Sequence, residues 1–555
     1  MWFAMNKQKI RLDFWTGVTV LSIAIFSLFL IYPLFSLFVS AFQNAETGAF
    51  SLEHFVHFFQ RKYYYQSMIN SFSVTLCVTV LAILIGTTLA YFMTKYKIKG
   101  KNVVEICIII SLLSPPFIGA YSWILIGGRS GMLTQWLYNT FGYEFPSIYG
   151  FAGILLVLTL KLYPFIYLYA AGAMKNIDSA LIEAAESLGC SGVRKVFTVI
   201  VPLITPTILA GALMVFMNAM ADFGTPMLIG EGFNVMPVMI YSEFINEVGD
   251  QANFAAAMAA IMVIITSTIF LLQKFVVNRK SFTMSSLRPM QSEPMTGAGN
   301  IVMHAIIYLL VALSMIPQLV VVYTSFLNTR GAVFVEGYSL DSYRTIFETL
   351  GTAITNTYLY STSAILLIVF LGATVAYLTT RRRSALTEFI DVLTMFPYII
   401  PGSVLGITLL LAFNDDPILL SGTAFIIIIS LVIRRLPYTL RSSSAILYQI
   451  SPSIEEASIS LGASPLKTFF KVTAVMMLPG VMSGAILSWI TAINELSSSV
   501  ILFTGATKTM SVAIYTEVIR ASYGTAAALS TILTITTIAA MVIFFRVSGS
   551  KDVTL

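Results

Sequence analysis

The sequence predicts an all-α integral membrane protein with about twelve transmembrane helices in two tandem six-helix halves. Its composition is 57% hydrophobic and only 10% charged, whereas a soluble domain is about 25% charged. Many apolar runs exceed the roughly 18 residues that a helix needs to cross a bilayer core of about 30 Å. The same series of motifs also occurs twice along the chain, which is typical of proteins built from related halves.

The apolar runs define the spans in chain order. In the first half we expect spans at 15–41, 70–93, 102–127, 148–173, 199–228 and 253–276. In the second half we expect them at 300–326, 354–380, 386–413, 421–447, 471–503 and 524–547. The first run is too long, and too poorly followed by a cleavage site, to be a removable signal peptide.

Lys and Arg residues give the orientation of the spans, because cytoplasmic loops carry an excess of them. With the N-terminus inside, most of the 32 basic residues fall in cytoplasmic segments, among them Lys7, Lys9, Arg11, Lys95, Lys97, Lys99, Lys101, Arg381, Arg382 and Arg383. An even number of spans then places both termini in the cytoplasm. The net charge of +6 is therefore a topology signal, and we expect no nucleic-acid partner.

An internal repeat divides the chain. From the fourth span onward, equivalent residues are a constant 273 positions apart, as Pro164 and Pro437 are. Further pairs are Glu183 and Glu456, Gly189 and Gly462, Phe197 and Phe470, Pro206 and Pro479, and Gly211 and Gly484. We expect a first half at 1–277, a polar cytoplasmic linker at 278–298 and a second half at 299–555. Parallel repeats of this kind place a pathway at the interface between the halves.

Each half carries one short polar segment between its fourth and fifth spans, EAAESLG at 183–189 and EASISLG at 456–462. Asp178 and Ser451 are suitable N-caps, and Pro452 follows the second cap at the first helical position. Each segment ends at a Gly, which suits a left-handed C-terminal cap. We therefore predict two helices of about ten residues, which are too short to be stable without a docking surface.

The composition of these two helices indicates what docks on them. A helix lying on a membrane surface usually carries large apolar residues with Lys or Arg, whereas these carry Ala and Glu. This difference favours a cytoplasmic protein partner that is needed in two copies. The residues that we expect to couple the chain to this partner are Glu183, Ala184, Ala185, Gly189, Glu456, Ala457, Ser458 and Gly462.

At these segments the sequence resembles a known family. Two segments resemble the EAA loop of permeases of ATP-binding cassette (ABC) importers, EAAESLGCSGVRKVFTVIVPLITP at 183–206 and EEASISLGASPLKTFFKVTAVMMLP at 455–479. They begin in the EAA loops that we place at 174–198 and 449–470. The second copy departs in having Ser458 for an Ala, and Val475 where the first half has Pro202. ADFGTPMLIG at 221–230 and NELSSSVILFTG at 494–505 are similar to ferric iron permeases, whose relatives carry 2-aminoethylphosphonate, other organophosphates or thiamine.

The resemblance implies a fold like that of type I ABC importers and a location in the bacterial cytoplasmic (inner) membrane. It also implies two copies of a cytoplasmic ABC ATPase subunit, an extracytoplasmic substrate-binding protein and contact with membrane lipid. No G-x-x-x-x-G-K-[ST] motif occurs in the chain, so we expect ATP hydrolysis by a separate subunit. We expect no catalytic residue and no cofactor bound by this chain.

Ionisable residues within spans are candidates for a pathway or gate. Asp222 and Glu495 are related by the repeat and lie about 23 residues into their spans, which is about 35 Å along a helix and near the outer mouth. A gate or a contact with the binding protein, or alternatively a solvated interfacial position, would explain them. Lys161 and Arg434, with Arg435 beside it, lie near the middle of spans four and ten.

We expect Asp222 and Glu495 to lie too far outward to neutralise these cations. Unpaired cations on the axis would repel bare Fe³⁺, and the pathway would then favour an anion. The alternative is that Lys161 and Arg434 snorkel away from the axis, or bond carbonyl groups freed by the nearby prolines.

Other classes of protein fit less well. A proton-coupled secondary transporter would not need the paired EAA segments, and an intramembrane enzyme would need a convergent nucleophile and base, or a metal set. His54 and His57 form an H-x-x-H pair on one side of the first outer loop, but no third ligand is evident, so we expect no metal site. The three cysteines are scattered and form no disulfide framework.

Overall fold

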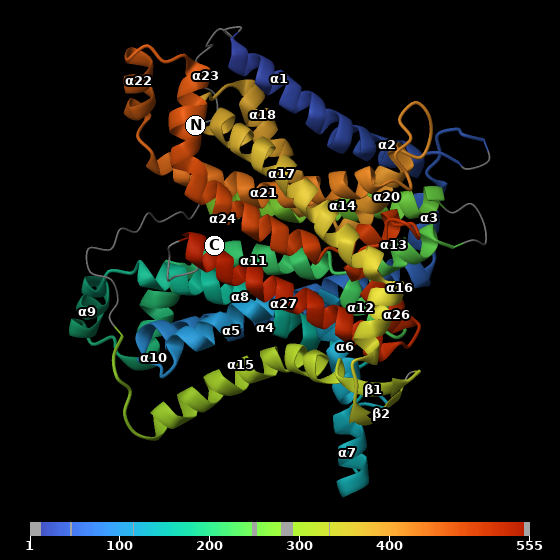
Figure 1. Ribbon diagram of the computed structural model, residues 1–555. Coiled ribbons are helices and arrows are strands. Elements are labelled where there is room, and N and C mark those ends of the chain that lie inside the picture. The colour runs from blue at the N-terminus through green and yellow to red at the C-terminus, as the bar shows by residue number, and fades with distance from the viewer. Residues whose placement is uncertain are drawn as a thin grey trace.

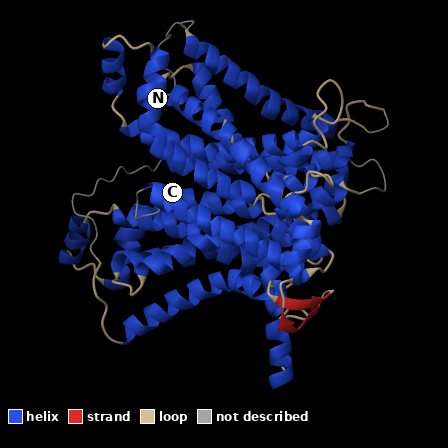
Figure 2. Cartoon of the chain, viewed as in Figure 1, coloured by secondary structure: helices blue, strands red, loops and turns tan. Residues whose placement is uncertain are grey.

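The computed structural model describes residues 13–44, 47–114, 116–246, 252–278, 292–331 and 333–548. The described chain is almost entirely helical, with one small antiparallel hairpin of β1 (Leu327–Arg330) and β2 (Val333–Tyr338) (Figure 2). The all-α prediction is thereby confirmed. Most of the predicted linker, and the basic residues Lys7, Lys9 and Arg11, lie outside the described residues.

The first half contains the long helices α1 (Phe14–Phe26), α2 (Tyr32–Ala41), α4 (Lys62–Lys95), α5 (Lys101–Leu113), α6 (Pro116–Gly127), α8 (Phe151–Lys175), α11 (Val201–Met220) and α14 (Ala252–Asn278). Its shorter helices are α3 (Glu53–Gln60), α7 (Met132–Phe141), α9 (Ser179–Ser187), α10 (Gly192–Lys195), α12 (Gly224–Ile229) and α13 (Met236–Phe244). Short π-helical turns join α1 to α2 and α10 to α11, so that each pair forms one span.

The second half contains the long helices α15 (Ala298–Thr324), α17 (Gly351–Arg381), α20 (Gly402–Ala412), α21 (Ala424–Gln449), α24 (Ala474–Ile493) and α27 (Tyr523–Ser548). Its shorter helices are α16 (Asp341–Thr349), α18 (Ala385–Leu393), α19 (Phe396–Ile399), α22 (Pro452–Ser460), α23 (Pro465–Thr468), α25 (Ser499–Leu502) and α26 (Met510–Ile519). A π-helical turn joins α23 to α24.

Each of the predicted spans corresponds to a helix or to a broken helical segment. Among the described residues, nine helices are long and apolar enough to cross a membrane, or ten if the bent pair α5 and α6 is one span. The two predicted spans outside this count are 386–413 and 421–447. The first is broken into α18, α19 and α20, and the second is α21, whose three arginines lower its hydropathy.

Two predicted spans end earlier than the sequence suggests. The run 199–228 ends as a helix at Met220, and the run 471–503 ends as a helix at Ile493. In both halves the chain breaks here and continues into a short apolar helix, α12 or α25. Hydropathy alone does not reveal this break, because the residues on both sides of it are apolar.

The first span of each half packs partly on its own half and partly on the opposite half. Trp15 of α1 lies against Tyr377 of α17 and Phe469, with ring centroids 4.7 and 5.0 Å apart. Met303 and Ile307 of α15 are buried in the core of the first half. Figure 1 shows α1 running beside α17 and α18, and α15 running beside α5. We call α1–α2 and α15 the swapped arms.

The two halves meet in a buried apolar cluster at one end of the molecule. Phe117 and Phe223 of the first half are fully buried there, together with Leu496 and Val500 of the second half. A Cβ on Gly224 would lie 3.4 Å from Leu496, so the two halves are in direct contact. We call this end the closed side. The helices α9 and α22 lie at the opposite end, which we call the EAA side (Figure 1).

Candidate functional site: the EAA helices, two ion pairs and an inner cavity

The EAA helices α9 and α22 have the caps that the sequence predicts. Asp178 accepts a hydrogen bond from the amide of Ala180 at 3.0 Å, and Ser451 caps α22 with Pro452 in its first turn. Gly189 and Gly462 adopt φ values of +81° and +89°, in the left-handed region. The helices therefore begin and end because of local sequence.

The C-terminal caps fix the direction of the following chain. In α9 the amide of Gly189 bonds the carbonyl of Glu186 and the amide of Cys190 bonds that of Ala185, which is the Schellman pattern. In α22 the amides of Gly462 and Ala463 make the equivalent bonds. The same turn therefore returns the chain to the membrane in both halves.

One face of each EAA helix is open to solvent. Leu188 is 88% exposed and Leu461 is 89% exposed, which is unusual for leucine. Glu183 and Ala184, and their repeat equivalents Glu456 and Ala457, are exposed on the same short helices. Ala185 and Ser458 are partly covered, and Gly189 and Gly462 are exposed at the ends. Each EAA helix thus presents small and apolar residues to a potential partner, with two exposed carboxylates on α9 and one on α22.

The two EAA helices are anchored by different chemistry. In α9 the buried side chain is Ile182, which packs into the apolar core of the first half. The equivalent residue in α22 is Glu455, whose carboxylate accepts from Arg381 Nε at 3.0 Å and from the Tyr377 hydroxyl at 3.3 Å. Both side chains of the Glu455–Arg381 pair are only 12% exposed. No sequence motif marks Glu455 as buried, although it precedes Glu456 directly.

The chain that follows each EAA helix is also held differently. Ser458, which departs from the EAA pattern, exchanges a 3.0 Å hydrogen bond with Thr468 at the start of the next helix. In the first half, Lys195 instead donates to Glu186 and holds the pKa of that carboxyl below its ordinary value. The Ser458 hydroxyl therefore stabilises the loop that follows α22, which the Ala of the EAA pattern could not do. Nothing in the structure explains Val475.

The structure corrects the predicted position of the two acidic residues. Lys161 Nζ lies 2.9 Å from Asp222 Oδ2, and Arg434 Nε lies 3.4 Å from Glu495 Oε2. Arg435 also donates to Glu495. The expectation that Asp222 and Glu495 lie too far outward was wrong, because it extended α11 and α24 through the break that follows each helix.

Each carboxylate also holds the short helix after the break. Asp222 Oδ1 accepts from the amide of Thr225 at 2.9 Å, and Glu495 Oε1 accepts from the amide of Ser498 at 3.2 Å. Thr225 and Ser498 are equivalent by the repeat. Each acid therefore ties the start of α12 or α25 to a base in the middle of α8 or α21. Each acid–base pair therefore stabilises the position of the short helix relative to the fourth span of its half.

A cavity of about 740 Å³, the inner cavity, lies between the halves. It extends along α21 from Arg434 to Gln449, toward the EAA side. Its lining includes three repeat-equivalent pairs, Phe165 and Tyr438, Tyr169 and Ser442, and Met214 and Leu487. The two halves therefore face each other across this space. Its charged lining residues are Arg434, Arg435 and Arg441, and no carboxylate is among the described residues that line it.

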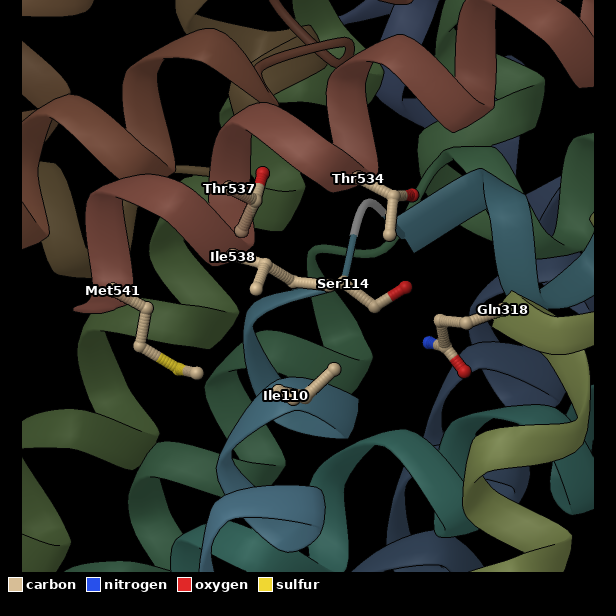
Figure 3. A pocket seen from close by; sticks show the side chains of 7 residues that line it. All are labelled: Ile110, Ser114, Gln318, Thr534, Thr537, Ile538 and Met541. Carbon is tan, nitrogen blue, oxygen red and sulfur yellow. The ribbon is translucent and has the colours of Figure 1, made fainter. Parts of the chain in front are cut away.

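Lys161 does not line the inner cavity. It lies at a separate space of about 20 Å³ with Ser314 and Gln318. An adjacent space of about 10 Å³ lies between α5, α15 and α27, where Ser114, Gln318 and Thr534 are gathered (Figure 3). A space of this size and polarity suits a single water molecule. These small spaces link the broken third span to α15 and α27.

The paired histidines of the first outer loop make contacts within the protein. His54 Nε2 lies 3.0 Å from the carbonyl oxygen of Gln43, and the His57 ring packs edge-on against Phe254. In the described ranges, no group of three His, Cys, Asp or Glu side chains is placed to hold a metal ion.

Comparisons with known proteins agree with this architecture. The family described as "Binding-protein-dependent transport system inner membrane component" matches residues 82–282 and 364–550. These matches fall once in each half and leave out both swapped arms.

The chain also aligns with individual permeases. "Ferric transport system permease protein FbpB" of Actinobacillus pleuropneumoniae is 28% identical over 99% of this chain and 81% of its own length. "Putative ferric transport system permease protein FbpB 1" of Haemophilus influenzae is 28% identical over 86% of this chain and 76% of its own length. "Putative 2-aminoethylphosphonate transport system permease protein PhnU" of Salmonella choleraesuis is 25% identical over 45% of this chain and 87% of its own length.

Membership of the matched family implies a multi-pass permease of an inner membrane that works with an ATPase and a substrate-binding protein. The two matches together cover well over half of the chain. The chain therefore belongs to the inner membrane components of binding-protein-dependent transport systems.

Proposed function

We propose that this chain is the complete membrane pathway of an ATP-driven importer of ferric iron, with both permease halves fused in one polypeptide. The main support for ferric iron as the substrate is the alignment with ferric transport permeases over nearly the whole chain. The two EAA helices and the cavity between the halves support the transport mechanism.

In this proposal two copies of a cytoplasmic ATPase bind the EAA helices, one on α9 and one on α22. The exposed Leu188 and Leu461 supply apolar contact, and Glu183 and Glu456 supply a charge beside it. Both termini and the EAA side face the cytoplasm, as the distribution of basic residues favours. A binding protein docks on the closed side.

The cycle begins from an arrangement in which the inner cavity extends toward the EAA side and the apolar cluster seals the closed side. ATP binding brings the two ATPase subunits together and moves α9 and α22 with them. Because α22 is tied to α17 through Glu455 and Arg381, this movement is transmitted to the second half. The contact of Gly224 with Leu496 then separates, and substrate enters from the binding protein.

Import of 2-aminoethylphosphonate is the second candidate. Its support is the similarity of one half to a permease of that name, together with the arginines that line the inner cavity. A phosphonate is an anion and suits this lining, whereas thiamine is a cation and does not.

The test is uptake by proteoliposomes that contain the chain, its ATPase and its binding protein. We expect ATP-dependent accumulation of ⁵⁵Fe³⁺ and no ATP hydrolysis by the chain alone. Accumulation of labelled 2-aminoethylphosphonate, with no accumulation of iron, would identify the phosphonate as the substrate instead of iron. Uptake that follows a proton gradient and persists without ATPase would overturn the proposal.

A further inference from the structure

The inner cavity carries a positive charge that the fold does not require. Arg434 and Arg435 line its end nearest the closed side, and both point to the same carboxylate, that of Glu495. One negative charge thus faces two positive charges. Arg441, further along the cavity, has its own partner in Asp391 at 3.0 Å. The end of the cavity therefore keeps an excess of one positive charge.

The same two arginines also keep unused hydrogen-bond donors. Arg434 Nη1 and Arg435 Nε are buried and meet no acceptor within the described part of the chain. Glu495 is already engaged, because Oε1 accepts from the amide and the hydroxyl of Ser498, and Oε2 accepts from Arg435 and forms an ion pair with Arg434. Both atoms are covered by the surrounding protein, and Arg434 Nη1 packs against Gly402, so the two arginines bring unbalanced positive charge to this end of the cavity.

The first half shows that the fold does not need the second arginine. Lys161, the equivalent of Arg434, pairs one to one with Asp222 at 2.9 Å and lies outside the inner cavity. The residue equivalent to Arg435 is Leu162. One base and one acid are therefore enough to tie the short helix after the break. Arg435 is an addition to that structural pair, and it faces the cavity.

We propose that Arg434 and Arg435 form an oxyanion-binding site at the end of the inner cavity, so that the cargo crosses the membrane with an anionic oxygen group. This proposal rests on the proposed transport function and names the chemical class of the cargo. Guanidinium groups bind phosphate, phosphonate and carboxylate oxygens through paired N–H donors. A bare Fe³⁺ ion is repelled here, whereas iron that is coordinated by oxyanions is not.

Binding is tested first, on the full-length chain in nanodiscs without partners. Inorganic phosphate at millimolar concentration, compared with chloride at equal ionic strength, should raise the thermal unfolding midpoint by a few degrees. Arg435→Leu, which copies the first half, should abolish this shift. Arg435→Lys should retain part of it, because the charge remains but the fork of donors is lost. Arg344→Leu removes an exposed arginine and should retain the full shift.

The Leu variant should fold, because Arg434 still pairs with Glu495 after the substitution. Its midpoint in chloride should therefore equal or exceed that of the wild type. Wild-type protein without a phosphate-dependent shift would overturn the site. A full shift in Arg435→Leu would do the same.

Transport separates this site from the choice of substrate. In proteoliposomes with ATPase and binding protein, Arg435→Leu should lower uptake about tenfold while ATPase association persists. Equal iron uptake by wild type and Arg435→Leu would refute the site and leave the iron proposal standing. Phosphonate uptake that depends on Arg435, without iron uptake, would support the oxyanion-binding site and refute iron as the substrate.

The origin of the oxyanion is tested in the same vesicles with doubly labelled substrate. Entry of ³²P-phosphate in fixed proportion to ⁵⁵Fe identifies the anion as a ligand of the iron. Entry of ³²P-phosphate without iron identifies the oxyanion as the cargo. Iron entry in phosphate-free and carboxylate-free buffer at the full rate would contradict the proposal.

Discussion

Lys161 and Asp222 are 61 positions apart in the chain, yet their charged atoms lie 2.9 Å from each other in the middle of the first half. The pair recurs in the second half as Arg434 and Glu495. Because both pairs link the fourth span of a half to the break after its fifth span, they determine where the pathway-forming helices end.

Asp222→Asn should destabilise the protein by about 3–5 kcal/mol, because it leaves the mostly buried Lys161 ammonium without a counter-charge. Adding Lys161→Met should recover most of this loss. Thermal unfolding in nanodiscs measures both variants. Glu231→Gln, which breaks the exposed pair with Arg129, is the control and should cost about 1 kcal/mol or less. Additive losses in the double variant would rule out the coupling.

Glu495→Gln should be more harmful than Asp222→Asn, because it leaves two arginines unpaired where Asp222→Asn leaves one lysine. The loss in unfolding free energy should exceed about 3–5 kcal/mol. Adding Arg435→Leu should restore part of the stability by removing one of the two charges. Equal midpoints for Glu495→Gln and Asp222→Asn would contradict the unequal charge balance.

Glu183→Lys combined with Glu456→Lys should abolish ATPase association while the chain still inserts in the membrane. Both residues are exposed on the EAA helices, so the change reverses charge without disturbing the core. Co-purification of the ATPase with the tagged chain measures the effect. Glu388→Lys, at the start of α18, reverses one exposed charge on the same side, as each of the two substitutions does, and should leave association intact. Normal ATPase recovery with the double variant would exclude these helices as the docking site.

Glu455→Ala should loosen α22 without affecting α9, because it removes the ionic anchor and strands Arg381. Ile182→Ala should do the reverse, by weakening apolar packing under α9. Hydrogen exchange of residues 179–187 and 452–460 distinguishes the two outcomes. We expect at least about tenfold faster exchange in the affected helix, equivalent to about 1.4 kcal/mol. Parallel changes in both helices would mean that the anchors are shared.

Gly402→Ala should displace the guanidinium of Arg434. A methyl group at this position would lie 1.7 Å from Arg434 Nη1 and 2.6 Å from Ser497 Cβ. We expect a loss of about 1–3 kcal/mol in unfolding free energy, typical of overpacking. Gly505→Ala is the matched control, because its Cβ would meet nothing within 4 Å. An unchanged thermal unfolding midpoint for Gly402→Ala would show that the Arg434 side chain can adopt another conformation without loss of stability.

Much of the fold follows from patterns that the sequence displays directly. Hydropathy located the spans, and the caps Asp178 and Ser451 located the EAA helices to within a residue or two. The ion pairs could not be placed, because they depend on helix breaks at Met220 and Ile493 that apolar residues conceal. Glu455 was overlooked for a similar reason, since its burial depends on Arg381 from a different span.

The cavity required three-dimensional contacts as well. Its lining comes from both halves, and no local motif marks it. The repeat nevertheless contained a useful signal. Leu162 and Leu168 stand where the second half has Arg435 and Arg441, so these two arginines of the cavity lining have no basic counterpart in the first half.

The swapped arms have a consequence for the order of synthesis. Trp15 is made before its partners Tyr377 and Phe469, which follow only after the rest of the first half and the linker. During that interval Trp15 lacks its aromatic partners, and the first half lacks its cover from α15. The native packing of the first half is therefore complete only after the second half has been made.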